Sequence, residues 1–381
     1  MNFSLSPEQQ DLRRRLAAAG AELGSGLEER ERSGAFDRPL WRRLGEAGLH
    51  GLPFPPAYGG GGFDLLSVAL GLEAFGGACR DEGLTFSLCA QMQSCAVPIW
   101  LAGSEEQRRR FLPGLAAGHL VGGNGTTEKA SGSDAFAMET TAARDGADYV
   151  LDGEKAWVTN GPLADLLLVY ALTSKPDRQF GGISAFLVEA GTPGLSRGPN
   201  LEKMGLRTAP WCCVQLAGCR VPASHRLGAE GAGAEIFREA MEWERLLLSA
   251  AALGRMADTL ERSLLHARTR KQFGKPIGRF QAIAGKLVQM KSDLESARLL
   301  LYKAAWLRDQ GERASLEISL GKLLINESRV RSCLDAIQIH GAAGCTTDLA
   351  IERELRNAIP VSIASGTSEM QQLIIAHLLG I

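Results

Sequence analysis

The sequence lacks the paired ligands of a metal or redox centre. Its six histidines include no HExxH pattern, and none of its eight cysteines belongs to a CxxC motif. Cys212 and Cys213 are adjacent, and neighbouring cysteines rarely form a disulfide. The ligand spacing of a zinc site is also absent. We therefore expect no metal ion, and reduced thiols of the kind found in cytoplasmic proteins.

Strong net charge and long apolar runs are missing as well. The chain has 42 basic and 43 acidic side chains and a formal charge of -1, so its charge balance does not favour nucleic acid or an anionic membrane. The first residues, MNFS, lack the basic region and apolar stretch of a signal peptide. No apolar run looks long enough to cross a bilayer. These absences indicate a cytoplasmic protein that binds neither nucleic acid nor membrane.

The sequence does contain ample material for a core. Its 381 residues are 45% hydrophobic and 22% charged, which is typical of a globular protein with two or three domains. Helical patterns come first, short strands with Gly and Pro turns follow, and long helical patterns return. This order predicts an α+β, mostly α chain. Its expected parts are an N-terminal helical domain (1–117), a middle antiparallel β domain (118–228) and a C-terminal four-helix bundle (229–381).

Local signals place several of these elements. The string SPEQ at 6–9 has the form of a helix start with a capping box. Pro113 is expected to end a short helix over 104–112. Asp152-Gly153 has the chemistry of a hairpin turn. Further strands are expected at 166–172, 183–189 and 212–218, and further helices at 38–47, 65–75, 234–269, 281–310, 315–341 and over the last ten residues.

Five strings, in this order along the chain, resemble motifs of the acyl-CoA dehydrogenases. They are TTEKASGSD (126–134), KAWVTNG (155–161), RKQFGKPI (270–277), QIHGAAG (338–344) and SGTSEMQ (365–371). The resemblance covers essentially the whole chain. It implies that family's homotetrameric fold of helical, β and four-helix-bundle domains. It also implies FAD-dependent removal of two hydrogens from Cα and Cβ of an acyl thioester.

The same resemblance assigns residues to the cofactor. The small polar loop 126–134 is suited to a pyrophosphate, while Trp157 and Thr159 match positions beside the reactive edge of the flavin. Four of the matching residues would reach the FAD of a neighbouring subunit, namely Arg270, Phe273, Gln338 and Gly341. The full predicted set for FAD is Thr126, Thr127, Gly132, Ser133, Trp157, Thr159, Arg270, Phe273, Gln338, Gly341, Thr367 and Glu369. Taken singly, these features also fit a polar turn, a buried strand residue and a solvated helix end.

The turn at 365–371 departs from the family at one position. Members of the family usually carry their catalytic glutamate where this chain has Ser365. The backbone amide of Ser365 matches a donor to the thioester carbonyl, and a backbone donor survives a change of side chain. A carboxylate base, in contrast, is lost when serine replaces glutamate at this position. The base is therefore expected elsewhere in the chain.

The segment 240–254 offers a replacement carboxylate. Helical spacing places Glu244 on an apolar stripe that also contains Phe237, Ala240, Met241, Leu248 and Ala251. Glu242 projects about 200° away from Glu244, and Arg245 about 100° away. Glu244 is thus predicted to lie among apolar side chains without a neutralising cation.

The family resemblance supports this carboxylate as the base. Branches such as the isovaleryl-type enzymes resemble this chain in holding the base in this helix, which makes Glu244 the predicted base. Arg245 is then the adjacent structural or substrate-binding residue. A partly exposed structural glutamate is the plain alternative, and Glu369 is a weaker rival for the base. In the implied mechanism Glu244 takes the α-proton, the β-hydrogen leaves as hydride to the flavin, and an electron-transfer flavoprotein or oxygen accepts the electrons.

The sequence leaves more than one class of substrate open. The motifs together look most like those of dehydrogenases that oxidise prolyl groups, or other acyl groups, tethered to an acyl or peptidyl carrier protein in secondary metabolism. A short- or branched-chain acyl-CoA dehydrogenase of catabolism is the alternative with a CoA thioester. A third possibility is a flavin monooxygenase or a non-catalytic flavoprotein with the same fold. Glu244, Trp157 and Thr159 together argue against this third possibility.

Overall fold

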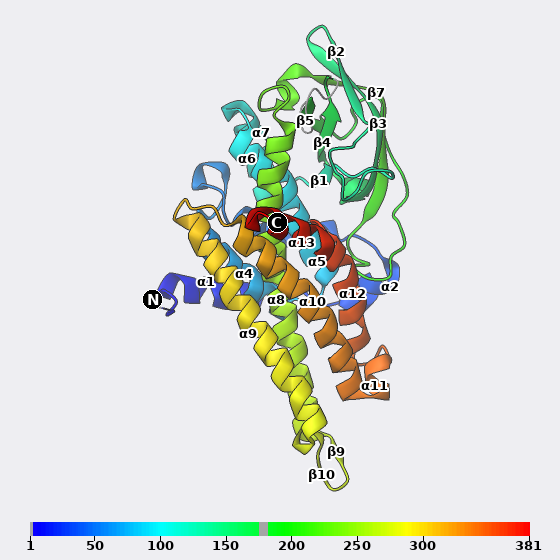
Figure 1. Cartoon of the computed structure of the whole chain (residues 1–381). Helices are drawn as coiled ribbons and strands as arrows, with labels where there is room; N and C mark the ends of the chain where they lie inside the picture. The colour runs from blue at the N-terminus through cyan, green and yellow to red at the C-terminus, as the bar shows by residue number, and fades with distance from the viewer. Residues whose placement is uncertain (1–2, 175–181) are drawn as a thin grey trace.

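The computed structural model describes residues 3–174 and 182–381, and its elements follow the predicted order of helices, strands and helices (Figure 1). Helix α1 begins as predicted, because Ser6 caps it and the capping box with Gln9 is complete. The helices that precede the sheet are α1 (Pro7–Leu23), α2 (Leu27–Ser33), α3 (Arg38–Glu46), α4 (Leu65–Ala78), α5 (Glu82–Gln91), α6 (Val97–Ala102) and α7 (Glu105–Ala116).

The middle of the chain forms an eight-stranded sheet of order β6-β7-β3-β2-β4-β5-β8, with β1 paired to β4. Its strands are β1 (Gly122–Gly125), β2 (Thr141–Asp145), β3 (Asp148–Thr159), β4 (Leu166–Leu172), β5 (Ile183–Glu189), β6 (Leu195–Arg197), β7 (Trp211–Pro222) and β8 (Arg226–Leu227). β1 and β2 run parallel to β4, whereas β3 and β5 run antiparallel to their neighbours. The sheet is therefore mixed, which corrects the prediction of an antiparallel domain. Parallel neighbours need a long connection, and the intervening strands supply it here.

The rest of the chain is helical again. Three long helices lie side by side, α8 (Gly233–Thr269), α9 (Gln281–Asp309) and α10 (Ser315–His340), followed by α11 (Ala342–Cys345), α12 (Ile351–Ile363) and α13 (Ser368–Leu379). A small hairpin of β9 (Lys271–Gln272) and β10 (Lys275–Pro276) joins α8 to α9 at the end of the bundle farthest from the sheet (Figure 1). Because α7 ends at Ala116 and α8 begins at Gly233, we propose domain boundaries at 117/118 and 228/229.

Two local predictions were wrong. β3 continues through Asp152 and Gly153, and the turn between β2 and β3 lies at Gly146, which has a φ of 62°. Gly153 instead marks a bulge against β7, and a Cβ there would lie 2.5 Å from Thr140 Oγ1. Pro113 lies inside α7 rather than at its end. Helix α12 was not predicted, because Pro360 interrupts its pattern.

One helical stretch meets the length and hydropathy of a membrane span, contrary to the sequence expectation. It covers Glu82–Ala102, and 83% of its most apolar window is buried inside the protein. It consists of α5, a π-helical turn (Met92–Ala96) and α6. Neighbouring helices and strands cover it, so its apolar character is that of a core helix.

Helices α4 and α8 cross at glycines. A Cβ on Gly254 would lie 2.1 Å from the carbonyl oxygen of Glu73, and one on Gly76 would lie 2.5 Å from that of Ala251. A methyl group therefore has no room between the two backbones. This close approach fixes where α8, the helix that carries Glu244, lies against the N-terminal helices.

Gly254→Ala is expected to destabilise the protein by about 3 kcal/mol or more, because the added methyl group would force the two helices apart. Gly285→Ala, in α9, is the matched control, because a Cβ there meets nothing within 4 Å. That control should gain about 0.5–1 kcal/mol from higher helix propensity. Denaturant unfolding of both variants checks this, and a Gly254→Ala protein as stable as the parent would contradict the close crossing.

Candidate active site

Glu244 lies half-buried on α8 and receives hydrogen bonds from two serines. The hydroxyl of Ser94 donates to Oε2, and the hydroxyl of Ser365 donates to Oε1. Ser94 belongs to the π-helical turn between α5 and α6, and Ser365 to the turn between α12 and α13. Three distant segments of the chain thus converge on one carboxylate. The predicted proximity of Glu244 and Ser365 is present in the structure.

Arg245 does not neutralise Glu244. Its Nη1 lies 3.8 Å from Glu242 Oε1, and its Nε donates to the backbone oxygen of Ser365 at 3.1 Å. Burial raises the pKa of Glu242, and the charge of Arg245 opposes that shift. The helical geometry predicted from the sequence separates the two carboxylates in this way. Arg245 therefore links the Glu242 side of α8 to the turn that carries Ser365.

The turn at 364–367 presents a free backbone donor. Ser365 has a φ of 58° and Gly366 a φ of 89°. Thr367 caps α13 by accepting the amide of Met370 at 3.3 Å. Among the described residues, no acceptor receives a hydrogen bond from the Ser365 amide. An unpaired amide beside Glu244 suits the predicted contact with a thioester carbonyl, which stays a prediction.

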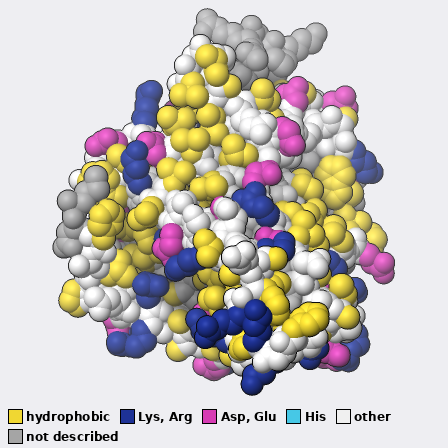
Figure 2. Space-filling model, turned by 60° about the horizontal axis from the view of Figure 1, so that its bottom comes forward, with side chains coloured by type: hydrophobic (Ala, Val, Ile, Leu, Met, Phe, Trp, Pro, Cys, Tyr) yellow, Lys and Arg dark blue, Asp and Glu magenta, His cyan; other side chains and the backbone are white. Residues whose placement is uncertain are grey.

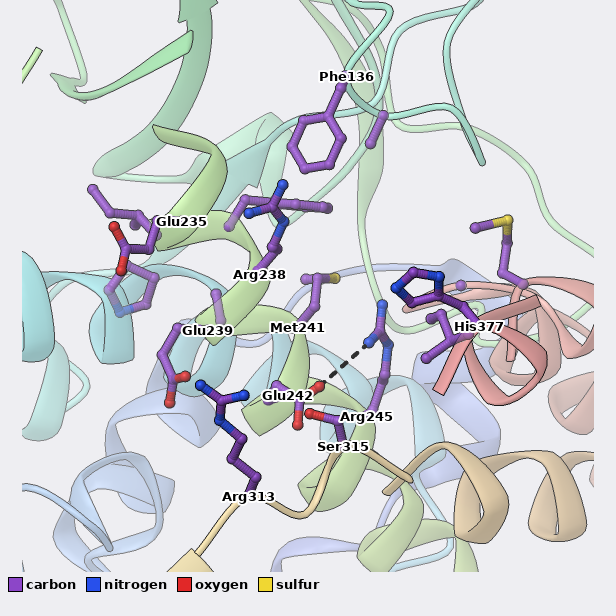
Figure 3. Close-up of a pocket in the computed structure, with 18 of the residues that line it drawn as sticks. Phe136, Glu235, Arg238, Glu239, Met241, Glu242, Arg245, Arg313, Ser315 and His377 are labelled. Carbon is purple, nitrogen blue, oxygen red and sulfur yellow. Dashed lines mark ion pairs between the residues drawn. The ribbon is translucent and has the colours of Figure 1, made fainter. Parts of the chain in front are cut away.

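A cavity of about 1390 Å³ borders this turn at Gly366, and Figure 3 shows residues that line the cavity. One wall is the face of α8 that carries Arg238, Met241, Glu242 and Arg245, and His377 of α13 lies opposite. The loop with the predicted residues Gly132 and Ser133 borders it, as do Phe136 and Phe237, whose rings pack edge to face at 5.6 Å. Gly366 and Arg245 also line it, and they are the sequence neighbours of Ser365 and Glu244, which are not themselves lining residues. The cavity is large enough for an acyl group on an extended thioester arm.

The other residues predicted for the flavin ring lie together at the sheet. The amide of Ala156 donates to Thr127 O at 2.8 Å, which joins the loop after β1 to β3. Thr126 donates to Asn124 within the same loop, and Thr159 ends β3. Trp157 has a φ of 52° and is 50% exposed. A large ring held half-exposed in a strained backbone fits a position against a flat cofactor.

A buried ion pair supports this loop from below. Lys155 Nζ lies 2.7 Å from Glu128 Oε1 and donates to Thr126 O at 3.2 Å, and both side chains of the pair are buried. Burial lowers the pKa of Lys155, while the bond to Glu128 raises it. Burial acts to raise the pKa of Glu128, but bonds from the Glu139 amide, Lys155 and Thr140 lower it overall. The pair ties β3 to the loop that carries Thr126 and Thr127.

The four residues predicted to reach a neighbouring subunit lie far from this group. Arg270 follows the end of α8, and Phe273 is at the tip of the β9–β10 hairpin, 93% exposed. Arg270 is 26 positions after Glu244, which corresponds to roughly 39 Å of helix. Gln338 and Gly341 lie at the end of α10. Within one chain these four do not meet Trp157.

Glu369, which was predicted to contact the flavin, and Ser94, which was not predicted for the site, belong to different parts of the fold. Glu369 is exposed in the first turn of α13, and a hydrogen bond to Thr367 lowers its pKa. It makes no contact with Glu244 among the described hydrogen bonds and ion pairs. Ser94 was not predicted, because it lies in the string QMQSCAVP, where no motif distinguishes it from core residues. A π-helical turn, which often marks a functional site, has no clear sequence signal.

Glu128→Gln is expected to destabilise the protein by about 3–5 kcal/mol, because it leaves the ammonium of Lys155 buried without its counter-charge. The double variant Glu128→Gln/Lys155→Met should recover most of that loss, since it removes the stranded charge as well. Denaturant unfolding of the parent, single and double variants measures both effects. Equal stability of parent and single variant would show that the pair does not support the loop.

The chain matches known proteins over nearly its whole length. The acyl-CoA dehydrogenase N-terminal, middle and C-terminal domains match residues 6–119, 123–219 and 231–380. An L-prolyl-(peptidyl-carrier protein) dehydrogenase from Serratia sp. is 40% identical over 382 residues, covering 100% of this chain and 99% of its own length.

Two solved structures have the same fold over their full length. The prolyl acyl carrier protein oxidase AnaB is 42% identical with a TM-score of 0.96, covering 99% of this chain and 100% of AnaB. PigA with FAD and proline is 40% identical with a TM-score of 0.98, covering 100% of this chain and 99% of PigA. Matches to all three domains and full-length relatives at this identity establish the relationship. The chain belongs to the acyl-CoA dehydrogenase family.

Proposed function

We propose that this chain is an FAD-dependent dehydrogenase of acyl thioesters whose substrate is a prolyl group on a carrier protein in secondary metabolism. The observation that carries the proposal is the position of Glu244, held by two hydroxyls directly behind Arg245 and Gly366, which line a large cavity. The relatives act on prolyl groups of carrier proteins according to their names, and one of their structures contains FAD and proline.

The residues of this chain fit FAD. The half-exposed Trp157 offers an apolar face, and Gly132 has open space around it, since a Cβ there meets nothing within 4 Å. Thr126, Thr127 and Ser133 belong to the loop that also carries Gly132, and Thr159 follows Trp157 at the end of β3, so we propose their hydroxyl groups as further contacts, together with Thr367 and Glu369. When bound, FAD supplies the acceptor for the hydride.

Residues of the protein accept the proton from Cα and stabilise the negative charge that develops on the thioester carbonyl. Glu244 accepts the proton from Cα, because it is hydrogen-bonded to the turn that carries Ser365 and no cation contacts it among the described residues. The Ser365 amide donates to the thioester carbonyl and stabilises the negative charge that develops there. Arg245 holds the backbone of Ser365 and borders the thioester arm. The aromatic rings of Phe136 and Phe237 exclude water from the cavity wall.

A homotetramer is proposed as the working state. Phe273 is almost fully exposed at the hairpin tip, and large apolar side chains on α9, α10 and α13 are exposed as well, namely Val288, Leu299, Trp306, Leu334, Leu373 and Leu379. Figure 2 shows apolar side chains spread among charged ones of both signs over one face. A second copy would cover such surface and bring Arg270, Phe273, Gln338 and Gly341 to its cofactor. We propose an electron-transfer flavoprotein or oxygen as the acceptor that reoxidises the cofactor.

A cytoplasmic location is part of the proposal. All eight cysteines are free, and Cys79, Cys89 and Cys95 are buried thiols whose pKa burial raises to about 12. Such thiols suit a reducing compartment. Within the described residues, no group of His, Cys, Asp and Glu could hold a metal ion.

An acyl-CoA dehydrogenase of short or branched chains is the second candidate, because the family match itself points to it. The two are separated by incubating the purified protein with prolyl-loaded carrier protein, isovaleryl-CoA or butyryl-CoA. Mass spectrometry then records the loss of two hydrogens. We expect loss from the prolyl group at a rate at least tenfold above either CoA thioester. Faster oxidation of a CoA thioester would reverse the assignment.

Glu244→Gln is expected to abolish this loss, by about a thousandfold or more, while FAD stays bound, because the amide cannot accept the α-proton. Glu242→Gln is the comparison within the same helix, and we expect it to lose less than tenfold. The rate of anaerobic flavin bleaching by the thioester measures both. A large loss in Glu242→Gln with full activity in Glu244→Gln would move the base to position 242.

A further inference from the structure

We propose that Ser94 and Ser365 are positioning residues that together clamp the base. Each hydroxyl donates to a different oxygen of Glu244, so the carboxylate is held in one orientation before substrate arrives. The proposal rests on the proposed function, in which Glu244 takes the α-proton. It adds a role for two side chains, one of which occupies the position where the base usually lies in this family.

The clamp is built from three separate parts of the fold. Ser94 and Glu244 are 150 positions apart, and Ser365 and Glu244 are 121 apart. The π-helical turn brings Ser94 from one side of α8, and the turn before α13 brings Ser365 from another. Contacts between such distant segments form only when the whole fold is in place. The orientation of the carboxylate is therefore set by tertiary structure rather than by α8 alone.

Both serines have backbones that are fixed independently of their hydroxyls. The side chain of Asn124 donates to Ser94 O at 2.9 Å. Arg245 Nε donates to Ser365 O at 3.1 Å, and the left-handed φ of 58° fixes the direction of the Ser365 side chain. A hydroxyl on a fixed backbone loses little freedom when it donates. The two donors are therefore preorganised for the carboxylate.

The charge of Glu244 depends on these donors, because no cation contacts it among the described residues. Arg245 pairs with Glu242, and Lys322 of α10 is buried with no hydrogen bond or ion pair within the described part of the chain. A charge-assisted bond from a neutral hydroxyl stabilises a carboxylate in a half-buried site. A contacting cation would stabilise it more and make it a weaker proton acceptor. Two neutral hydroxyls therefore hold the carboxylate without a cation in contact.

The clamp also leaves room for the reaction. A carboxylate oxygen has two lone-pair directions, and each serine occupies one of them. The second direction on either oxygen stays open for the proton from Cα. A glutamate at position 365 would instead bring a like charge against Glu244, which would favour protonation of one of the two carboxyl groups. Serine therefore suits position 365 once the base is on α8.

The test measures flavin bleaching in a single turnover without oxygen. We expect Ser94→Ala and Ser365→Ala each to slow bleaching by about ten- to hundredfold, as for the loss of a hydrogen bond to a charged group. Ser365→Gly should be as slow as Ser365→Ala, although it relieves the left-handed backbone. Ser94→Thr keeps the hydroxyl and should retain most of the rate. Ser319→Ala removes a buried hydroxyl of α10 that has no hydrogen-bond partner in the described part of the chain, so it should change the rate by less than about twofold.

Two readouts separate positioning from a general structural effect. Loss of a donor makes the carboxylate easier to protonate, so the acid limb of the pH–rate profile should move to higher pH in both alanine variants. The deuterium isotope effect at Cα should rise, because proton removal becomes slower relative to other steps. Structural damage alone would lower the rate without moving either readout.

One other carboxylate near Glu244 titrates on the acid side, because burial raises the pKa of Glu242, so the pH profile of each serine variant is also recorded in the Glu242→Gln background. The remaining titrating groups near Glu244 are Arg245 on α8, Lys322 on α10, Cys89 on α5 and Tyr170 on β4. Burial and Arg245 lower the pKa of Lys322 to about 8, against the opposing charge of Glu244. Burial raises the pKa of Cys89 to about 12 and raises that of Tyr170 further. Arg245, Lys322, Cys89 and Tyr170 therefore titrate on the alkaline side of the pH–rate profile, away from the acid limb.

The outcomes distinguish the clamp from the proposed function. Three thioesters are tested, namely prolyl-loaded carrier protein, isovaleryl-CoA and butyryl-CoA. Each presents an acidic Cα–H, so the clamp can be measured with whichever of them bleaches the parent enzyme fastest. Preference for a CoA thioester would overturn the proposed substrate and leave the clamp standing. Parental rates, pH limbs and isotope effects in both alanine variants would overturn the clamp alone. Bleaching by none of the three thioesters would overturn both.

Discussion

The site depends on one ionised carboxylate placed in a half-buried position with no cation in contact among the described residues. In such a position the free energy of the charge has to come from hydrogen bonds. Glu244 has two, both from serine hydroxyls, while Arg245 is occupied by Glu242 and by the backbone of Ser365. Because Arg245 contacts these two groups and not Glu244, no cation competes with the substrate proton for the carboxylate.

The rest of the architecture serves to hold that carboxylate still. α8 is 37 residues long and is fixed against α4 where Gly76 and Gly254 allow the two backbones to approach. A helix positioned by backbone contact cannot rotate without separating the pair, because interiors are close-packed. The direction in which Glu244 points is thus determined by a crossing about ten residues away along α8.

Backbone strain is concentrated at positions that matter for the proposed chemistry. Among the described residues, six that are not glycine have positive φ values, and Trp157, Phe273 and Ser365 are three of them. Each had been assigned to flavin or substrate from its motif. A strained conformation persists only where its surroundings enforce it, and functional sites are where such strain collects. At Ser365 the result is a side chain directed at Glu244 and a backbone amide left without an acceptor among the described residues.

From the sequence, periodicity and capping predicted the order of helices and strands and the long helices, and the resemblance of the five motif strings identified the family. The choice of Glu244 as the base stays a prediction from that resemblance and from helical spacing. It failed at Gly153, because a glycine in a bulge and a glycine in a turn look alike until the partner strand is known. It could not identify Ser94, because a serine among core residues gains its meaning only from the helix that packs against it. Tertiary structure alone decided which groups meet Glu244, since hydrogen bonds across more than a hundred residues leave no local pattern.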